Sequence, residues 1–358
     1  MKDWYQPLKA SLSKVMKICI CGGGNLGHVV AGYLAASKEH EITMLTNKPE
    51  KWSKNIQVTD LYGKIFNGEL ALASSSPVDA LSGADIVLMC LPGFAFHDEL
   101  LKIKDYISFP TKVGSVVSSS GFFFEAFDIL PDDITLFGFQ RVPFIARTIE
   151  YGKSAALKGY KKALNVAIER CSEEEKKKLC KVLSSLFNTP VNLLHSFYEA
   201  ALTNSNPLLH PARLYSLWKD WAPEITYSHN PLFYEEWTDE ASEYLIAMDG
   251  EFQELLYHLP VQEGCIPPIL DYYESSDAQS LTNKLRSIPA FVGISSPMIK
   301  LPDNHGYIPD FNSRYFTEDI PFGMRYIVDV ANNVGIEIPL IDKIFSWGIS
   351  RIKRNNKN

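Results

Sequence analysis

A glycine-rich run near the start of the chain is the first stretch whose residue types and spacing could do chemistry. It reads GGGNLG and contains the pattern G-x-G-x-x-G at Gly22, Gly24 and Gly27. The run follows an apolar, strand-type segment and opens a helical pattern, which is the setting in which this motif binds a dinucleotide. The first glycine permits a tight turn, the second lets the backbone approach a pyrophosphate, and the third allows close helix packing. We therefore predict a cofactor site at the helix N-terminus, formed by Gly22, Gly24, Asn25, Leu26 and Gly27.

The residues after the second predicted strand bear on which dinucleotide binds. NAD-binding domains usually place an acidic residue at the end of this strand, where it holds the ribose 2′-hydroxyl. Here the strand ends in Thr46, Asn47 and Lys48, and no acid occurs before Glu50. Thr46 and Asn47 can donate hydrogen bonds, and Lys48 or Lys51 could hold a 2′-phosphate. The sequence therefore favours NADP slightly over NAD.

Two polar motifs in the second half could act on a substrate. In NPLLHP, Asn206 and His210 are four residues apart and share one face if the segment is helical. In RYFTEDIPFG, Arg314 offers a planar guanidinium for a carboxylate, and Asp319 could orient a histidine that acts as general acid and base. These residue types predict acid–base chemistry on a carboxylate-bearing substrate.

Each of these residues also has a purely structural interpretation. Asp319 stands just before a proline-led helix and is equally suited to cap that helix. His210 could be a hydrogen-bonded histidine of the core or the surface, and Arg314 could form a surface ion pair. Asn206 could cap its own helix. The residues alone leave these alternatives open.

The elements that must position these residues form two different patterns. Strand-type runs alternate with helical segments in the first half, which predicts a mostly parallel, doubly wound Rossmann-type sheet. The expected strands are 15–21, 41–46, 84–91 and 113–118, with shorter runs at 135–139, 154–158 and 164–168 continuing the same sheet, and the expected cofactor helix is 25–36. Leu91 and Pro92, at the end of the third strand, are expected by fold analogy to line the cofactor cleft.

The second half is predicted to be an all-α domain. Ser172 and Glu175 form a capping box that opens a helix to about residue 186, and 189–194 suits a last strand. Helical patterns then recur at 198–203, 208–218, 239–258, 278–285, 321–333 and 339–353. We place the boundary near residue 190, so that 15–190 binds NAD(P) and 191–358 carries the substrate and the catalytic residues.

The motifs GGGNLGH, NPLLHP and RYFTEDIPFGM with VGIEIPLID resemble those of the opine dehydrogenases, the octopine/nopaline dehydrogenase group, over about residues 15–344. The resemblance implies an enzyme that joins a 2-oxo acid to the amino group of an amino acid and reduces the imine with NAD(P)H. It places the catalytic histidine on His210, its partner aspartate on Asp319 and the carboxylate-binding arginine on Arg314. Asn206 receives a supporting role.

Two other functions fit the same pattern of domains. One is an NADP-dependent 2-oxo acid reductase of the ketopantoate reductase type, which would rely on a lysine that the sequence lacks in a comparable setting near residue 200. The other is a non-catalytic nucleotide-binding regulatory protein, which would need neither His210 nor Arg314 nor Asp319. An aromatic-rich region suits helix packing, a bulky amine or a second subunit of a possible homodimer; it includes Trp218, Trp221, Tyr227, Phe233, Tyr234 and Trp237.

Composition excludes several other classes of protein. The net charge of −7 provides no basic surplus for nucleic acid or an anionic membrane surface. The longest apolar run, residues 86–91, is far shorter than the roughly 20 residues that span a bilayer. The six cysteines lack CxxC spacing, so we expect no metal site, and the first fourteen residues lack an apolar stretch of signal-peptide length. We expect a cytoplasmic protein whose partners are small molecules.

Overall fold

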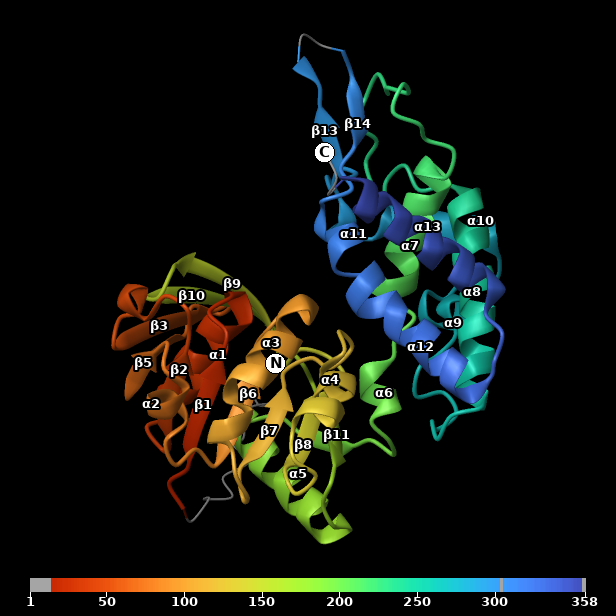
Figure 1. The fold of residues 1–358 in the computed structure, drawn as a ribbon. Helices are drawn as coiled ribbons and strands as arrows, with labels where there is room; N and C mark the ends of the chain where they lie inside the picture. The colour runs from red at the N-terminus through yellow and green to blue at the C-terminus, as the bar shows by residue number, and fades with distance from the viewer. Residues whose placement is uncertain (1–13, 303–304, 356–358) are drawn as a thin grey trace. The chain divides into compact units, whose positions relative to one another are not determined.

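The chain divides into two compact units, which meet in sequence between Ala201 and Leu202. The computed structural model describes residues 14–302 and 305–355. In Figure 1 the first unit is coloured from red to green and the second from green to blue. The expectation about the first fourteen residues falls, apart from Lys14, outside the described ranges. Residues 191–201 pack with the first unit because their short strand extends its sheet.

An eight-stranded sheet forms the centre of the first unit, which confirms the Rossmann-type class. The strand order is β12-β11-β8-β7-β6-β1-β2-β5, and β11 runs antiparallel to β8 while the other neighbours are parallel. The strands are β1 (Lys17–Cys21), β2 (Glu41–Leu45), β5 (Leu72–Ser74), β6 (Ile86–Met89), β7 (Lys112–Ser115), β8 (Thr135–Phe139), β11 (Leu164–Glu169) and β12 (Val191–Leu193). The parallel order brings the carboxyl ends of β1, β2 and β6 to one edge.

Both faces of this sheet are covered, which explains why β1 is apolar at consecutive positions. Ile18 and Ile20 pack into the core shared with α1 and α5, whereas Cys19 and Cys21 pack on the opposite face against α3 and α4. The helices are α1 (Asn25–Ala35), α2 (Pro77–Leu81), α3 (Phe96–Ile103), α4 (Phe122–Ile129), α5 (Glu173–Phe187) and α6 (Tyr198–Ala201). The predicted capping box at the start of α5 is confirmed. All six cysteines are free thiols.

A second sheet of four strands corrects one sequence prediction. Its order is β4-β3-β10-β9, with β3 (Asn55–Asp60), β4 (Ile65–Glu69), β9 (Phe144–Glu150) and β10 (Ser154–Tyr160). The run 154–158 was expected in the main sheet, but β10 pairs with β3 and β9 instead. Ala155 and Leu157 are buried in the core that α1 also enters. An apolar strand pattern indicates burial and leaves the neighbouring strand undetermined, so this prediction was wrong.

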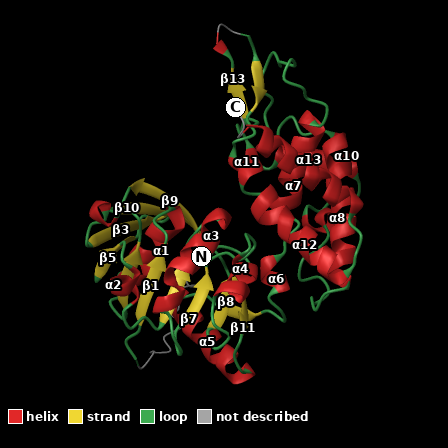
Figure 2. Cartoon of the chain, viewed as in Figure 1, coloured by secondary structure: helices red, strands yellow, loops and turns green. Residues whose placement is uncertain are grey.

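The second unit is mainly helical, and a hairpin of β13 (Met298–Lys300) and β14 (Tyr307–Pro309) departs from the predicted all-α domain (Figure 2). Its helices are α7 (Asn206–Trp218), α8 (Asp239–Tyr257), α9 (Ile269–Tyr272), α10 (Ala278–Ser287), α11 (Arg314–Thr317), α12 (Arg325–Val334) and α13 (Pro339–Asn355). A π-helical turn, Ile320–Met324, leads into α12. The Glu251 carboxylate of α8 accepts the backbone N–H groups of Leu340 and Ile341, which fixes the start of α13.

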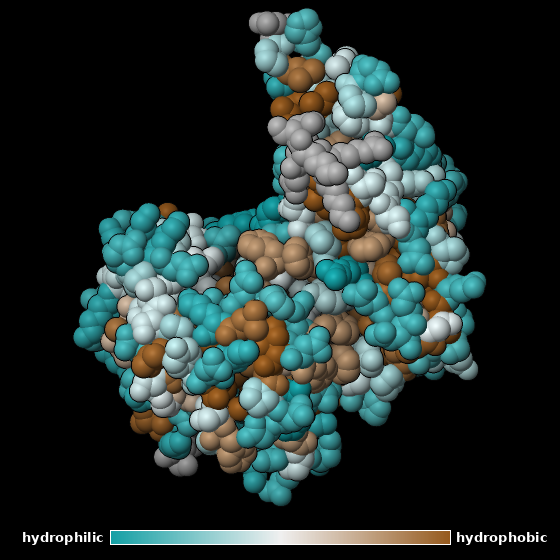
Figure 3. Space-filling model, viewed as in Figure 1, coloured by the Kyte–Doolittle hydropathy of each residue, from teal (hydrophilic) through white to brown (hydrophobic). Residues whose placement is uncertain are grey.

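The surface of each unit is mostly hydrophilic on the face that Figure 3 shows, with smaller apolar patches between charged residues. Among the described residues, no helix combines the length and apolar character needed to cross a membrane. Within the same residues, His, Cys, Asp and Glu side chains form no group of three that could hold a metal ion.

Candidate functional site

The glycine loop after β1 has the geometry that its spacing predicts. Gly22 has φ +109°, a conformation that L side chains rarely adopt, and a Cβ there would lie 2.6 Å from the carbonyl oxygen of Cys90. A Cβ on Gly27 would overlap the carbonyl oxygen of Gly22, so α1 approaches the loop closely. A Cβ on Gly24 would meet no atom within 4 Å. The fold therefore requires glycine at Gly22 and Gly27, whereas Gly24 faces open space.

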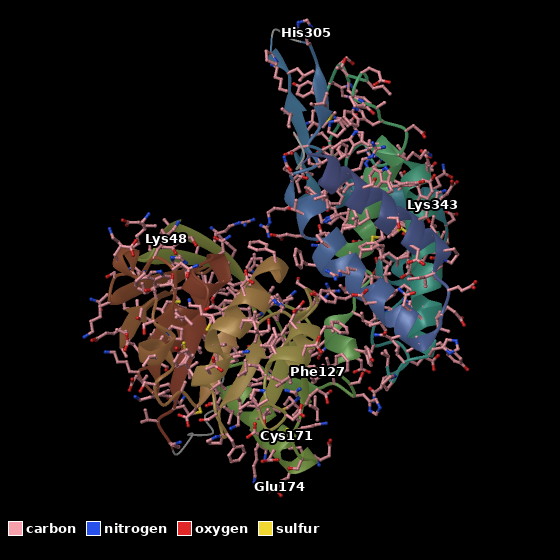
Figure 4. The ribbon with its side chains drawn as sticks, viewed as in Figure 1. Lys48, Phe127, Cys171, Glu174, His305 and Lys343 are labelled. Carbon is pink, nitrogen blue, oxygen red and sulfur yellow. The ribbon has the colours of Figure 1, made fainter. Side chains whose placement is uncertain are left out.

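A pocket of about 230 Å³ lies at this loop. It joins three segments that the sequence analysis selected separately: the glycine loop, the end of β2 and the end of β6. Its lining residues are Gly22, Gly23, Leu45, Thr46, Asn47, Lys48, Leu91, Glu99 and Tyr151. Lys48, labelled in Figure 4, belongs to the loop that follows β2. Pro92 follows Leu91 and caps the short 3₁₀ turn Gly93–Ala95.

Two residues of this pocket had no signal in the sequence. Glu99 comes from α3, and its partial burial raises the pKa of its carboxyl, an effect that Lys102 opposes. Tyr151 comes from the turn between β9 and β10, and a Cβ on Gly23 would lie 2.6 Å from its hydroxyl oxygen. The second sheet thus places an aromatic side chain directly over the glycine loop. Only the three-dimensional pairing of strands brings this turn to the loop.

Asn25 and His28 attach the start of α1 to the second sheet. The Asn25 Oδ1 atom accepts the backbone N–H of Thr148 at 2.8 Å. The His28 Nε2 atom accepts the N–H of Gly152 at 2.7 Å, so Nδ1 carries the proton and donates to the Gly24 carbonyl at 2.9 Å. Burial lowers the pKa of His28, which keeps the ring neutral. Asn25 was predicted to contribute to the cofactor site, and its side-chain oxygen is engaged by the protein.

In the second unit, the fold brings His210 and Asp319 together across 109 residues of sequence. His210 lies on α7, and its Nδ1 atom is 2.7 Å from Asp319 Oδ2, so the ring donates to the carboxylate. Asp319 stands at the start of the π-helical turn but makes no capping hydrogen bond with its side chain. The helix-cap alternative therefore does not describe this carboxylate. The pair has the geometry in which a carboxylate orients a histidine for proton transfer.

Tyr234 contacts the other ring nitrogen of His210. Its hydroxyl lies 2.9 Å from His210 Nε2, and the residue is only 4% exposed. Its ring stacks on Phe291 with a centroid separation of 3.9 Å. Tyr315 adds a further aromatic contact to His210, with ring centroids 4.6 Å apart and the two rings nearly perpendicular. The sequence analysis placed Tyr234 in an aromatic-rich region but assigned it no role.

Arg314 and Asn206 lie in more exposed positions. The Arg314 side chain is 81% exposed, and its guanidinium donates to Glu318 Oε2 at 2.6 Å, which raises its pKa. Asn206 is the exposed first residue of α7, while Ser205 occupies the N-cap position, so Asn206 does not cap the helix. The structure thus brings His210 and Asp319 into contact and pairs Arg314 with a glutamate.

A neighbouring asparagine anchors the segment that leads into α7. Asn204 is buried and donates to Asp249 Oδ1 of α8 and to the carbonyl of Pro267, both at 2.8 Å. Asp249 also accepts the N–H of Ile269 at 2.7 Å. Burial raises the pKa of the Asp249 carboxyl, and these hydrogen bonds oppose the rise. This network holds the start of α7, and therefore His210, against α8.

Two family models match different parts of the chain. Residues 193–350 match the alpha-helical domain of NAD/NADP octopine/nopaline dehydrogenase. Residues 17–109 match the coenzyme F420-dependent NADP oxidoreductase model. The first match contains His210, Arg314 and Asp319, and the second contains the glycine loop.

Known proteins are similar over nearly the whole length. The opine dehydrogenase of Haliotis discus hannai is 27% identical over 366 residues, covering 94% of this chain and 90% of that protein. A structure of octopine dehydrogenase with NADH and L-arginine has a TM-score of 0.82 and 25% identity, covering 95% of this chain and 90% of the other. A structure of yersinopine dehydrogenase with NADP⁺ has a TM-score of 0.69 and covers 95% of this chain and 91% of the other; at 14% identity it shows a shared fold alone.

Proposed function

Since this chain belongs to the opine dehydrogenase family, we propose that it catalyses the reductive condensation of a 2-oxo acid with the amino group of an amino acid. NAD(P)H is the hydride donor, and the products are a secondary amine, water and NAD(P)⁺. The observation that carries this proposal is the His210–Asp319 hydrogen bond, because it joins an acid–base group to its orienting carboxylate inside the matched domain.

We infer that the pocket beside the glycine loop holds part of a dinucleotide. The free space at Gly24 and the N–H groups at the start of α1 suit a pyrophosphate. The cofactor supplies the hydride when it is bound. Thr46, Asn47 and Lys48 line the part of the pocket that follows β2, where a ribose 2′-phosphate would gain from a positive charge. This arrangement supports the proposed preference for NADP over NAD.

His210 provides the proton transfers in the proposed reaction. It would supply the proton that reaches the carbonyl oxygen of the oxo acid during attack by the amine, recover one from the nitrogen of the adduct, and supply it again to the hydroxyl that leaves the carbinolamine as water. The Asp319 carboxylate accepts the Nδ1–H of the ring and so fixes its tautomer and orientation. The placement of acid and carboxylate therefore serves both the addition and the dehydration step.

Arg314 is the proposed binding group for a substrate carboxylate. Its guanidinium is accessible, and Glu318 already occupies it with a carboxylate. A substrate carboxylate would replace Glu318 in a bidentate pair, which fixes orientation as well as charge. Asn206 lies one helical turn before His210, and we propose a supporting polar contact to the substrate from this position.

The test is the initial rate of NADPH and NADH oxidation with a panel of 2-oxo acids, each with and without pooled amino acids. The proposal predicts oxidation that requires both an oxo acid and an amine. Oxidation with the oxo acid alone would support the ketopantoate reductase type of function instead. Cofactor binding without oxidation under any condition would support the regulatory alternative.

Light scattering and cell fractionation test the proposed homodimer and cytoplasmic location.

A further inference from the structure

Both ring nitrogens of His210 already form hydrogen bonds to protein groups. An imidazole nitrogen has a single in-plane direction for its lone pair or its hydrogen. Asp319 takes this direction at Nδ1 with a distance of 2.7 Å, and the hydroxyl of Tyr234 takes it at Nε2 with a distance of 2.9 Å. A substrate therefore has no direct access to either ring nitrogen while these bonds persist.

The donor and acceptor roles follow from the Asp319 contact. Because Nδ1 donates to the carboxylate, Nε2 of the neutral ring is an acceptor and Tyr234 donates to it. In the imidazolium, Nε2 donates and the oxygen of Tyr234 accepts. Burial raises the pKa of Tyr234, so the hydroxyl remains protonated and can serve in both roles. The hydroxyl thus remains bonded through both protonation states of His210.

Packing holds Tyr234 in this position. Its ring stacks on Phe291, with centroids 3.9 Å apart and planes 15° from parallel, and on Trp237, at 6.1 Å and 6°. Trp237 is itself held, because its Nε1 donates to Ser242 at 3.0 Å and its carbonyl accepts from Arg286. Rotation of Tyr234 away from His210 would break both the stacking and the hydrogen bond.

We propose that Asp319, His210 and Tyr234 form one proton-transfer chain, in which the Tyr234 hydroxyl exchanges the proton with the substrate. This inference rests on the proposed condensation reaction and assigns its terminal acid. Tyr234 is then a catalytic residue, and His210 acts through it. The aromatic-rich region that contains Tyr234 would contribute to the reaction as well as to packing.

The dehydration step shows the balance of atoms and charge. The C–O bond of the carbinolamine breaks with both electrons on oxygen, and the proton of the Tyr234 O–H completes the departing water. The Nε2–H bond of His210 breaks as its proton forms a new O–H bond on Tyr234. The positive charge passes from the imidazolium to the iminium group, and nothing is oxidised or reduced before hydride transfer.

The test compares Tyr234→Phe with Tyr215→Phe in the complete enzyme. Both changes remove one hydroxyl from a buried tyrosine of the helical unit, and Tyr215 lies on α7, more than one turn beyond His210. We expect Tyr234→Phe to lower kcat by about 10² or more while the KM values change by less than about threefold. We expect Tyr215→Phe to retain wild-type kcat, and thermal melting checks that both variants fold.

A proton inventory on the wild-type enzyme gives a second measurement that needs no variant. Two protons moving together predict a bowed dependence of the rate on the fraction of D₂O, whereas direct transfer from His210 predicts a straight line. A folded Tyr234→Phe enzyme with wild-type or higher kcat would overturn the proposed proton-transfer chain. A linear dependence of the rate on the fraction of D₂O would overturn it as well. Absence of condensation by the wild-type enzyme would instead overturn the proposed function on which it rests.

Discussion

The proposed cofactor pocket beside the glycine loop and the cluster of His210, Asp319 and Tyr234 are built in opposite ways. The pocket depends on backbone shape: Gly22 and Gly27 are required because any side chain there would collide with main-chain atoms. The cluster depends on polar atoms of side chains, with Nδ1 and Nε2 of His210 each assigned to one partner. A side chain added at these glycines should therefore disrupt the pocket, and removal of a single polar atom should disrupt the His210 cluster.

The largest effect is expected from His210→Gln. Loss of the acid–base group should lower kcat by about 10³, since a positioned general acid or base contributes roughly 10²–10⁴. The Kd for NADPH, measured by fluorescence titration, should stay within about twofold because the glycine loop is unchanged. Wild-type turnover in this variant would remove His210 from the chemistry, and a large loss of NADPH affinity would break the distinction between the two regions.

A pair of glycine variants sharpens the comparison within the cofactor region. In Gly27→Ala the new methyl group would overlap the Gly22 carbonyl, so we expect a loss of at least about 2 kcal/mol in the free energy of unfolding. Gly24→Ala meets no atom within 4 Å and should cost less than about 1 kcal/mol. The methyl group of Gly24→Ala should still raise the Kd for NADPH about tenfold by entering the ligand space. Chemical denaturation and titration give both quantities, and equal stabilities of the two variants would contradict the assigned roles.

The sequence predicted contiguous features well and distant pairings poorly. The glycine loop, the strands β1 and β2 and the capped helix α5 follow from local patterns. The second sheet was missed because β10 pairs with β3, almost a hundred residues earlier, and no local pattern encodes that choice. Tyr151 reaches the cofactor pocket through this same sheet, so its position could not be predicted either.

The candidate catalytic residues also separate into those that the sequence identifies and those whose contacts only the fold reveals. Residue types and a family resemblance selected His210 and Asp319, but their spacing of 109 residues carries no geometric information by itself. Tyr234 was indistinguishable from its aromatic neighbours because its role depends on where its hydroxyl points. The Arg314–Glu318 pair did leave a signal, since residues four apart on a helix are neighbours.

A smaller effect is expected from Lys48→Ala. Removal of the charge that would meet a 2′-phosphate should raise the Kd for NADPH about tenfold and leave the Kd for NADH nearly unchanged. Lys51→Ala is the matched control because Lys51 does not line the pocket. Equal weakening of both cofactors by Lys48→Ala would show that this lysine does not discriminate between them.

The smallest effect is the pH dependence contributed by His28. Its folded-state pKa is lowered by burial below the ordinary 6.5, so the unfolded chain takes up the proton first as the pH falls. The contribution of the neutral His28 ring to the free energy of unfolding is fully present above pH 6.5. It is lost as the pH falls toward the folded-state pKa, by at most about 1.4 kcal/mol per pH unit. His28→Asn should flatten the free energy of unfolding between pH 7.5 and 5 relative to wild type. An unchanged slope would contradict the neutral state assigned to this ring.

The most direct test of the central claim is mass spectrometry of the product formed with NADPH deuterated at its transferable hydride. The account predicts a secondary amine whose mass equals the amine plus the oxo acid, less one water, plus one hydrogen and one deuterium. The deuterium should lie on the former carbonyl carbon of the oxo acid. A deuterated 2-hydroxy acid, formed whether or not an amine is present, would contradict the assignment of reductive condensation to this protein.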